Sequence, residues 1–156
     1  MPFIFSKKLC MKWFIDNKRF DMTDLMINIE FLPENKPLRY FLSGVNLIKY
    51  PNLLNSTFNQ DDFYLSSMSL RFYKNLDWED LQELDQKGNI KEDELVVYHE
   101  VYGDVIIKES LFSHILVDYS SKLIEAYKDD RTLPAQWSED VLKGIKQLKK
   151  KMKHHV

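Results

Sequence analysis

Alternating hydrophobic and polar positions predict β-strands along much of the chain. The stretch 65–74 alternates most regularly, with Met68, Leu70 and Phe72 on one face and polar side chains between them. This pattern is typical of a strand with one buried and one solvated face. Less regular apolar runs predict further strands at 12–15, 21–32, 40–50, 95–102 and 105–108. The run 21–32 also fits helical spacing, and we interpret it as a strand.

Turn-forming residues separate these predicted strands. Pro33–Pro37 and the polar stretch Pro51–Asp62 are interpreted as loops, because proline, asparagine and aspartate gather there. Gly103 and Asp104 lie between two β-branched runs and predict a tight hairpin. Gly44 interrupts the strand expected at 40–50.

Helical spacing dominates the last third of the chain. Apolar residues recur on one helical face over 110–128, and a second amphipathic pattern covers 138–153. A shorter helix is expected at 77–86, with Asp77 as its N-cap and acids in the first turn, where the helix dipole favours them. The sequence therefore predicts a single α+β domain, mostly antiparallel sheet with two C-terminal helices and a short helix near 77–86.

Length and composition agree with one globular domain. The chain has 156 residues, 44% of them hydrophobic and 29% charged. It has no apolar run of the roughly 18 residues that a membrane span needs. Lys7 and Lys8 interrupt the apolar start that a secretory signal would require, so we expect a cytoplasmic protein. Residues 1–10 are expected to form a loosely attached arm, or to extend the first strand, and 11–156 to form the domain; Met11 is a possible alternative start.

The charge is distributed unevenly along the chain. The formal net charge is −2, but the last sixteen residues hold six lysines and no acid. Residues 77–104 hold ten acids and only two bases, Lys87 and Lys91. Such a field attracts basic protein surfaces and repels nucleic acid. The alternative is a solvated helix and loop whose charges only confer solubility.

Aromatic residues accompany these acids. Tyrosine and tryptophan are common anchors in protein interfaces, and acids around them would select a basic partner. On a strand, Tyr98, Glu100 and Tyr102 would share one face. The candidate partner-binding residues are Trp78, Glu79, Asp80, Glu83, Glu92, Asp93, Glu94, Tyr98, Glu100 and Tyr102.

The sequence offers no catalytic motif. It lacks HExxH and G-x-S-x-G, and its four glycines form no phosphate-binding loop. The single cysteine, Cys10, excludes an internal disulfide and a cysteine-rich zinc site. We therefore expect no enzyme activity, cofactor or metal. The lysine-rich C-terminal helix could contact nucleic acid or a membrane, but the acidic body disfavours both, and we interpret it as a solvated helix.

Within Val97–Tyr127, VYHEVYGDVIIKESLFSHILVDYSSKLIEAY, a predicted strand pair turns at Gly103-Asp104 and leads into a helix that carries Phe112 and Asp118-Tyr119. This segment, about a fifth of the chain, resembles bacterial toxin-immunity proteins of the contact-dependent growth-inhibition or polymorphic-toxin kind. The resemblance implies one-to-one binding of a cognate toxin domain, often a nuclease, whose basic active site is blocked. Two alternatives stay open: a non-catalytic adaptor or phage-type accessory protein that binds another host protein, and a small hydrolase of unknown type.

Overall fold

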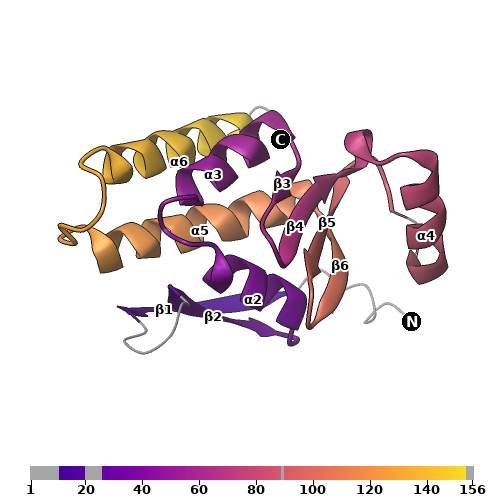
Figure 1. Ribbon diagram of the computed structural model, residues 1–156, viewed down its shortest axis with the longest axis horizontal. Helices are drawn as coiled ribbons and strands as arrows, with labels where there is room; N and C mark the ends of the chain where they lie inside the picture. The colour runs from indigo at the N-terminus through magenta and orange to yellow at the C-terminus, as the bar shows by residue number, and fades with distance from the viewer. Residues whose placement is uncertain (1–10, 20–25, 89, 154–156) are drawn as a thin grey trace.

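Two antiparallel sheets and a set of helices form the α+β fold that the sequence predicts (Figure 1). The computed structural model describes residues 11–19, 26–88 and 90–153, without the side chains of residues 19 and 85–88. The arm expected at 1–10 lies outside the described residues. The two-stranded sheet pairs β1 (Lys12–Arg19) with β2 (Ile27–Leu32). The four-stranded sheet has the order β3 (Phe63–Tyr64), β4 (Met68–Phe72), β5 (Glu94–His99) and β6 (Gly103–Lys108).

The described helices include the three that the sequence predicts. These are α4 (Trp78–Gly88), α5 (Glu109–Tyr127) and α6 (Trp137–Lys153). Two more helices precede them, α2 (Lys36–Gly44) and α3 (Tyr50–Asn59). The strands expected at 12–15, 65–74, 95–102 and 105–108 are also confirmed, with shifted ends. The strand expected at 21–32 is confirmed over Ile27–Leu32, and residues 21–25 of it lie outside the described residues.

The strand expected at 40–50 and the loop expected at 51–62 are wrong, because α2 and α3 occupy these positions. Asn35 caps α2 by accepting a hydrogen bond from the Leu38 N–H at 3.2 Å. Pro37 and Pro51 lie in the first turns of their helices, where proline is tolerated because its missing N–H would have no partner there. Prolines that suggest loops therefore mark helix starts.

The hairpin between β5 and β6 turns earlier than expected. Its loop is Glu100–Tyr102, and Gly103 already pairs with His99. Gly103 has a φ of 86°, a conformation that closes such a three-residue loop and favours glycine. Because β5 ends at His99, the single face expected for Tyr98, Glu100 and Tyr102 does not form.

The core lies between the helices and the inner face of the four-stranded sheet, and α5 crosses its middle (Figure 1). Two buried tyrosines join α5 to its neighbours. The Tyr119 hydroxyl donates to the Ile27 carbonyl at 2.8 Å, and the Tyr50 hydroxyl lies 2.7 Å from the Ser120 Oγ. Burial raises the pKa of both phenols, so they remain neutral. Residues far apart in sequence are thus fixed around α5.

The contact between α3 and α6 gives a first test. A Cβ at Gly144 would lie 2.8 Å from the Leu54 Cβ, which cannot rotate away, whereas one at Gly44 would meet only the mobile end of Met68. We expect Gly144→Ala to lower the free energy of unfolding by about 1–2 kcal/mol despite alanine's higher helix propensity. Gly44→Ala is the matched control and should change stability far less. Equal effects in chemical denaturation would contradict this packing.

Candidate protein-binding surface

The outer face of the four-stranded sheet is only partly covered. A small second cluster of buried residues, Leu84, Ile90 and Val96, packs α4 against this face. In Figure 1, α4 stands at the end of the molecule, away from the other helices. The part of the sheet nearer the β5–β6 turn therefore stays open to solvent.

One row of side chains crosses this open part. The strand register places Tyr64 opposite Ser69, Ser69 opposite Tyr98, and Tyr98 opposite Asp104. Directly opposed residues of antiparallel strands point to the same side of a sheet. Tyr64 is 59% exposed and Tyr98 is 43% exposed, although both are large aromatic residues. The row thus presents two tyrosines on an accessible surface.

A groove separates this row from α4. Its volume is about 280 Å³. The sheet contributes Ser69, Arg71, Val96, Tyr98 and Asp104, and α4 and the residues before it contribute Leu76, Asp80, Glu83 and Leu84. We call this depression, with the neighbouring Tyr64, Trp78 and Glu79, the α4 groove.

Arg71 holds the two walls of the α4 groove together. Its Nε lies 3.1 Å from the Asp62 Oδ2, and its Nη1 lies 3.0 Å from the Asp80 Oδ2. Asp80 also accepts a hydrogen bond from the Asp77 N–H at 3.2 Å, while the Asp80 N–H donates to the Asp77 Oδ1 at 2.8 Å. This reciprocal capping confirms Asp77 as the helix start and fixes the first turn of α4.

Asp62 anchors Arg71 on the sheet side. Its Oδ1 accepts from the Phe72 N–H and from the Asn75 side chain, both at 3.0 Å. Burial alone would raise the pKa of Asp62, but these hydrogen bonds and the Arg71 guanidinium outweigh burial and lower it. The pKa of Asp80 is lowered mainly by the Asp77 N–H and also by Arg71. Both carboxylates are therefore ionised near neutral pH.

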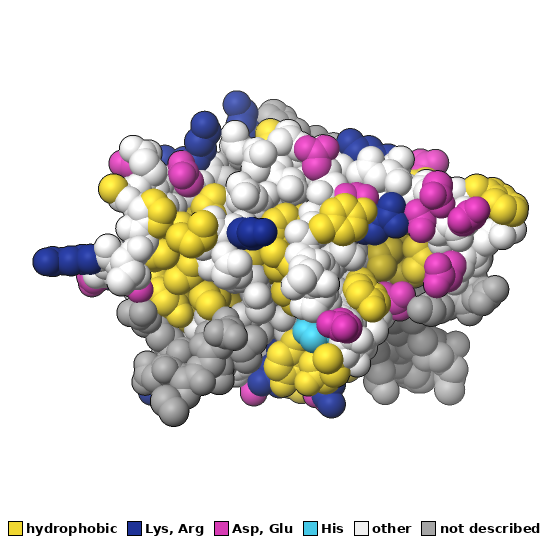
Figure 2. All heavy atoms as spheres, viewed as in Figure 1, with side chains coloured by type: hydrophobic (Ala, Val, Ile, Leu, Met, Phe, Trp, Pro, Cys, Tyr) yellow, Lys and Arg dark blue, Asp and Glu magenta, His cyan; other side chains and the backbone are white. Residues whose placement is uncertain are grey.

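The structure brings together one part of the sequence-predicted site. Asp80 and Glu83 face Tyr98 across the α4 groove, and Trp78 lies at the start of α4 with 69% of its surface exposed. Glu79 is exposed in the same first turn. Figure 2 shows acidic side chains gathered at the end of the molecule where α4 lies, with hydrophobic side chains exposed beside them.

Glu92, Asp93 and Glu94 do not join the α4 groove. They lie at the beginning of β5, where the Asp93 Oδ2 is 3.6 Å from the Lys108 Nζ and Glu94 accepts from the Lys91 N–H at 2.7 Å. The buried cluster under α4 separates them from Tyr98. The ten candidates therefore do not form one continuous surface.

Glu100 and Tyr102 also lie elsewhere, in the β5–β6 turn. The Tyr102 ring stacks on Tyr40 of α2 with centroids 4.6 Å apart, and the Lys36 Nζ is 5.8 Å from the Tyr102 centroid. The neighbouring His99 ring is 5.1 Å from Tyr102. Tyr102 is thus packed against its own chain and on the α2 side of the sheet, whereas Tyr98 points to the outer side.

Sequence reasoning did not identify seven residues of the α4 groove as site residues: Tyr64, Ser69, Arg71, Leu76, Leu84, Val96 and Asp104. Ser69 and Arg71 were identifiable as the solvated face of a strand, but not as neighbours of α4. No pattern in the sequence indicates Tyr64 as a site residue. It lies in a strand of two residues, between the loop predicted at 51–62 and the strand predicted at 65–74. The proximity of the strand residues among the seven follows from strand register, which local patterns do not specify.

Comparison with known protein families, with curated proteins and with solved structures finds no match to this chain. Among residues 11–19, 26–88 and 90–153, no helix has the length and apolar character needed to cross a membrane. Within the same described part of the chain, no three or more histidine, cysteine, aspartate or glutamate side chains gather as metal ligands would.

The low pKa of Asp62 gives a pH-dependent test. A carboxylate whose pKa is lower in the folded state stabilises the fold above its unfolded pKa, ordinarily 3.8, and this stabilisation is lost as the pH falls through the folded pKa. Asp62→Asn should therefore cost about 1–3 kcal/mol near neutral pH, through lost charge-assisted hydrogen bonds. The difference from wild type should shrink below about pH 4. Urea titrations at several pH values measure the difference in free energy of unfolding between the variant and wild type. A difference that does not change with pH would contradict the low pKa of Asp62.

Proposed function

We propose that this protein binds and neutralises a basic domain of another protein, in the manner of a bacterial toxin-immunity protein, and that the α4 groove makes the contact. The observation that carries the proposal is the juxtaposition of the exposed Tyr98 with acidic side chains of α4 across an open groove, with the exposed Tyr64 in the same row of the sheet. Interface anchors are typically aromatic, and surrounding charge selects the partner.

The charge balance of the groove favours a cationic partner. Arg71 is the basic residue among those that line it, and Asp62 and Asp80 already pair with it. Glu79 and Glu83 are exposed, and neither forms an ion pair with another described residue. Their negative field is therefore available to lysine or arginine side chains of a partner, and it speeds association with them.

A nuclease domain fits this chemistry well. Its active site must be basic because it holds nucleic-acid phosphates. Acidic side chains on a preformed surface can occupy the same place, so binding would exclude the nucleic acid. The proposed role involves no catalysis, no cofactor and no direct contact of this chain with nucleic acid or membrane, and it places the complex in the cytoplasm, as the sequence analysis predicts.

The test reverses Glu79 and Glu83, which form no ion pair with another residue that the structure describes. Asp80 is left intact, because its reversal would break the Arg71 contact and the cap of α4. We expect Glu79→Lys with Glu83→Lys to slow association with the cognate partner by about tenfold or more at low salt and to flatten its salt dependence. The partner is first captured from the native host with the tagged full chain, and rates are then measured by surface plasmon resonance.

Glu139→Lys with Asp140→Lys provides the matched control. These two acids are exposed in the first turn of another helix, α6, and the control makes the same change in net charge. It should associate at nearly the wild-type rate. Equal rates for wild type and the α4 variant would place the interface elsewhere. A partner gene directly beside this one, encoding a toxin, supports inhibition, whereas a partner without toxicity supports an adaptor instead.

A further inference from the structure

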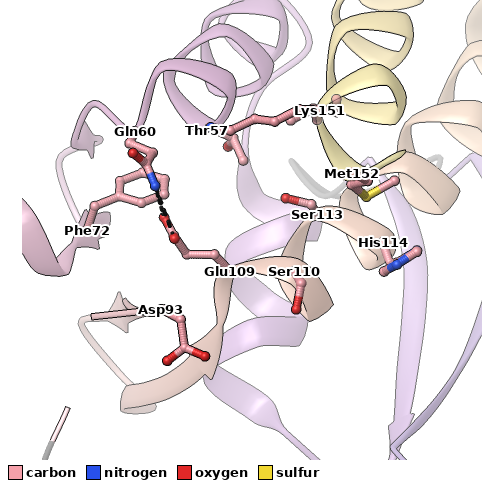
Figure 3. A pocket seen from close by; sticks show the side chains of 11 residues that line it. Thr57, Gln60, Phe72, Asp93, Glu109, Ser110, Ser113, His114, Lys151 and Met152 are labelled. Atoms are coloured by element: carbon pink, nitrogen blue, oxygen red, sulfur yellow. Dashed lines mark hydrogen bonds between the residues drawn. The ribbon is translucent and has the colours of Figure 1, made fainter. Parts of the chain in front are cut away.

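A second cavity lies on another part of the molecule, where the ends of several elements meet (Figure 3). Its volume is about 350 Å³, within the range of small-molecule sites. The end of α3, the first turns of α5 and the last turns of α6 surround it, and Phe72 of β4 closes one side. None of these lining residues belongs to the α4 groove, so the cavity is independent of the proposed function.

The cavity combines an apolar wall with one carboxylate. Phe72 and Leu148 are almost completely buried, and Met152 is half-buried beside them. Glu109, the first residue of α5, points into the space between α3 and the sheet (Figure 3). Buried apolar surface favours a ligand with a hydrocarbon body, and the carboxylate sets the chemistry of its polar end.

The Glu109 carboxylate is held in place by a neutral group. Gln60 directs its Nε2 to both oxygens, at 2.8 and 3.1 Å (Figure 3). Gln60 itself caps α3 in the left-handed conformation, with a φ of 56°, so this amide is positioned by the backbone. A single amide leaves acceptor positions on the carboxylate and does not neutralise its charge. Among the described residues, Glu109 has no cation within ion-pair distance.

The lysine that lines the cavity is directed elsewhere. The Lys151 Nζ donates to the Phe58 carbonyl at 2.7 Å and lies 5.6 Å from the Phe58 ring centroid. Its ammonium therefore caps the C-terminal end of α3, where the free helix carbonyls favour a cation. The Asp93 carboxylate at the cavity mouth faces Lys108 at 3.6 Å. Glu109 is thus a carboxylate beside the apolar wall that has no cation partner among the described residues.

We propose that this cavity binds a small organic cation, a primary amine with an apolar body. The ammonium group contacts the free acceptor positions of Glu109, and the Ser113 hydroxyl, which lines the same space, offers a further acceptor. The hydrocarbon part packs on Phe72, Leu148 and Met152. A ligand carboxylate would be repelled by Glu109, and a neutral alcohol would gain only a weaker hydrogen bond.

The test compares three probes of similar shape by NMR titration of the full chain. We expect phenethylamine and related primary amines to bind saturably and to shift the signals of residues lining the cavity. Phenylethanol should bind at least about tenfold more weakly, because a neutral hydroxyl forms a weaker hydrogen bond with the Glu109 carboxylate than an ammonium does, and phenylpropionate should bind at least as weakly, because its carboxylate is repelled. Equal binding of amine and alcohol, or no saturable binding by any primary amine, would overturn the proposal.

Two variants assign the binding to this cavity. Glu109→Gln keeps the size of the side chain and should weaken amine binding about tenfold or more, whereas Glu139→Gln, an exposed acid at the far end of α6, should not. Ser113→Phe fills the cavity from α5 and should abolish amine binding although Glu109 itself is not replaced. Unfolding midpoints verify that each variant is folded. Wild-type amine affinity in folded Glu109→Gln or Ser113→Phe would place the amine elsewhere.

Discussion

Arg71 joins the four-stranded sheet to α4, and the shape of the outer face depends on this contact. Its guanidinium reaches Asp62 on one side and Asp80 on the other, each at about hydrogen-bond distance. The planar, five-donor guanidinium can satisfy two carboxylates at once, which a lysine ammonium does with less geometric definition. Since Asp80 is also part of the α4 cap, one residue sets both the position and the start of the helix.

The two faces of the four-stranded sheet are packed differently. The inner face, with Leu95 and Val97, belongs to the main core around α5. The outer face carries only a small cluster under α4, and its remaining part presents Tyr64 and Tyr98 to solvent. Substitutions on the open outer face should therefore have little effect on the core, which suits the binding role that we propose for this face.

Local patterns predicted the elements whose hydrophobic period is long and regular. The helices α5 and α6 and the strand β4 follow directly from their spacing, and Asp77 identifies the start of α4. The strand and loops predicted over 36–59 are wrong, because Pro37 and Pro51 suit a first helical turn as well as a loop. A short helix has few periodic apolar positions, so its prediction depends strongly on residues such as proline that mark the ends of elements.

The candidate surface was predictable only in part. Asp80, Glu83 and Tyr98 were identified from charge and aromatic content, and the fold places them together. Local patterns do not show that Tyr102 turns back onto Tyr40, because β5 ends at His99, three residues before the strand end expected at Tyr102. The sequence analysis did not predict the pair formed by Glu109 and Gln60, because their contact depends on where α3 ends relative to α5. Tertiary contacts of this kind are not encoded in any local pattern.

The most direct test of the central claim is amide hydrogen exchange of Arg71→Gln against wild type. If Arg71 holds α4 against the sheet, the amides of α4 lose protection in the variant while those of α5 and α6 keep theirs, because α4 opens as a separate unit. Unchanged protection of α4 would contradict the account, as would a uniform loss across all helices, since the groove would then not depend on this contact.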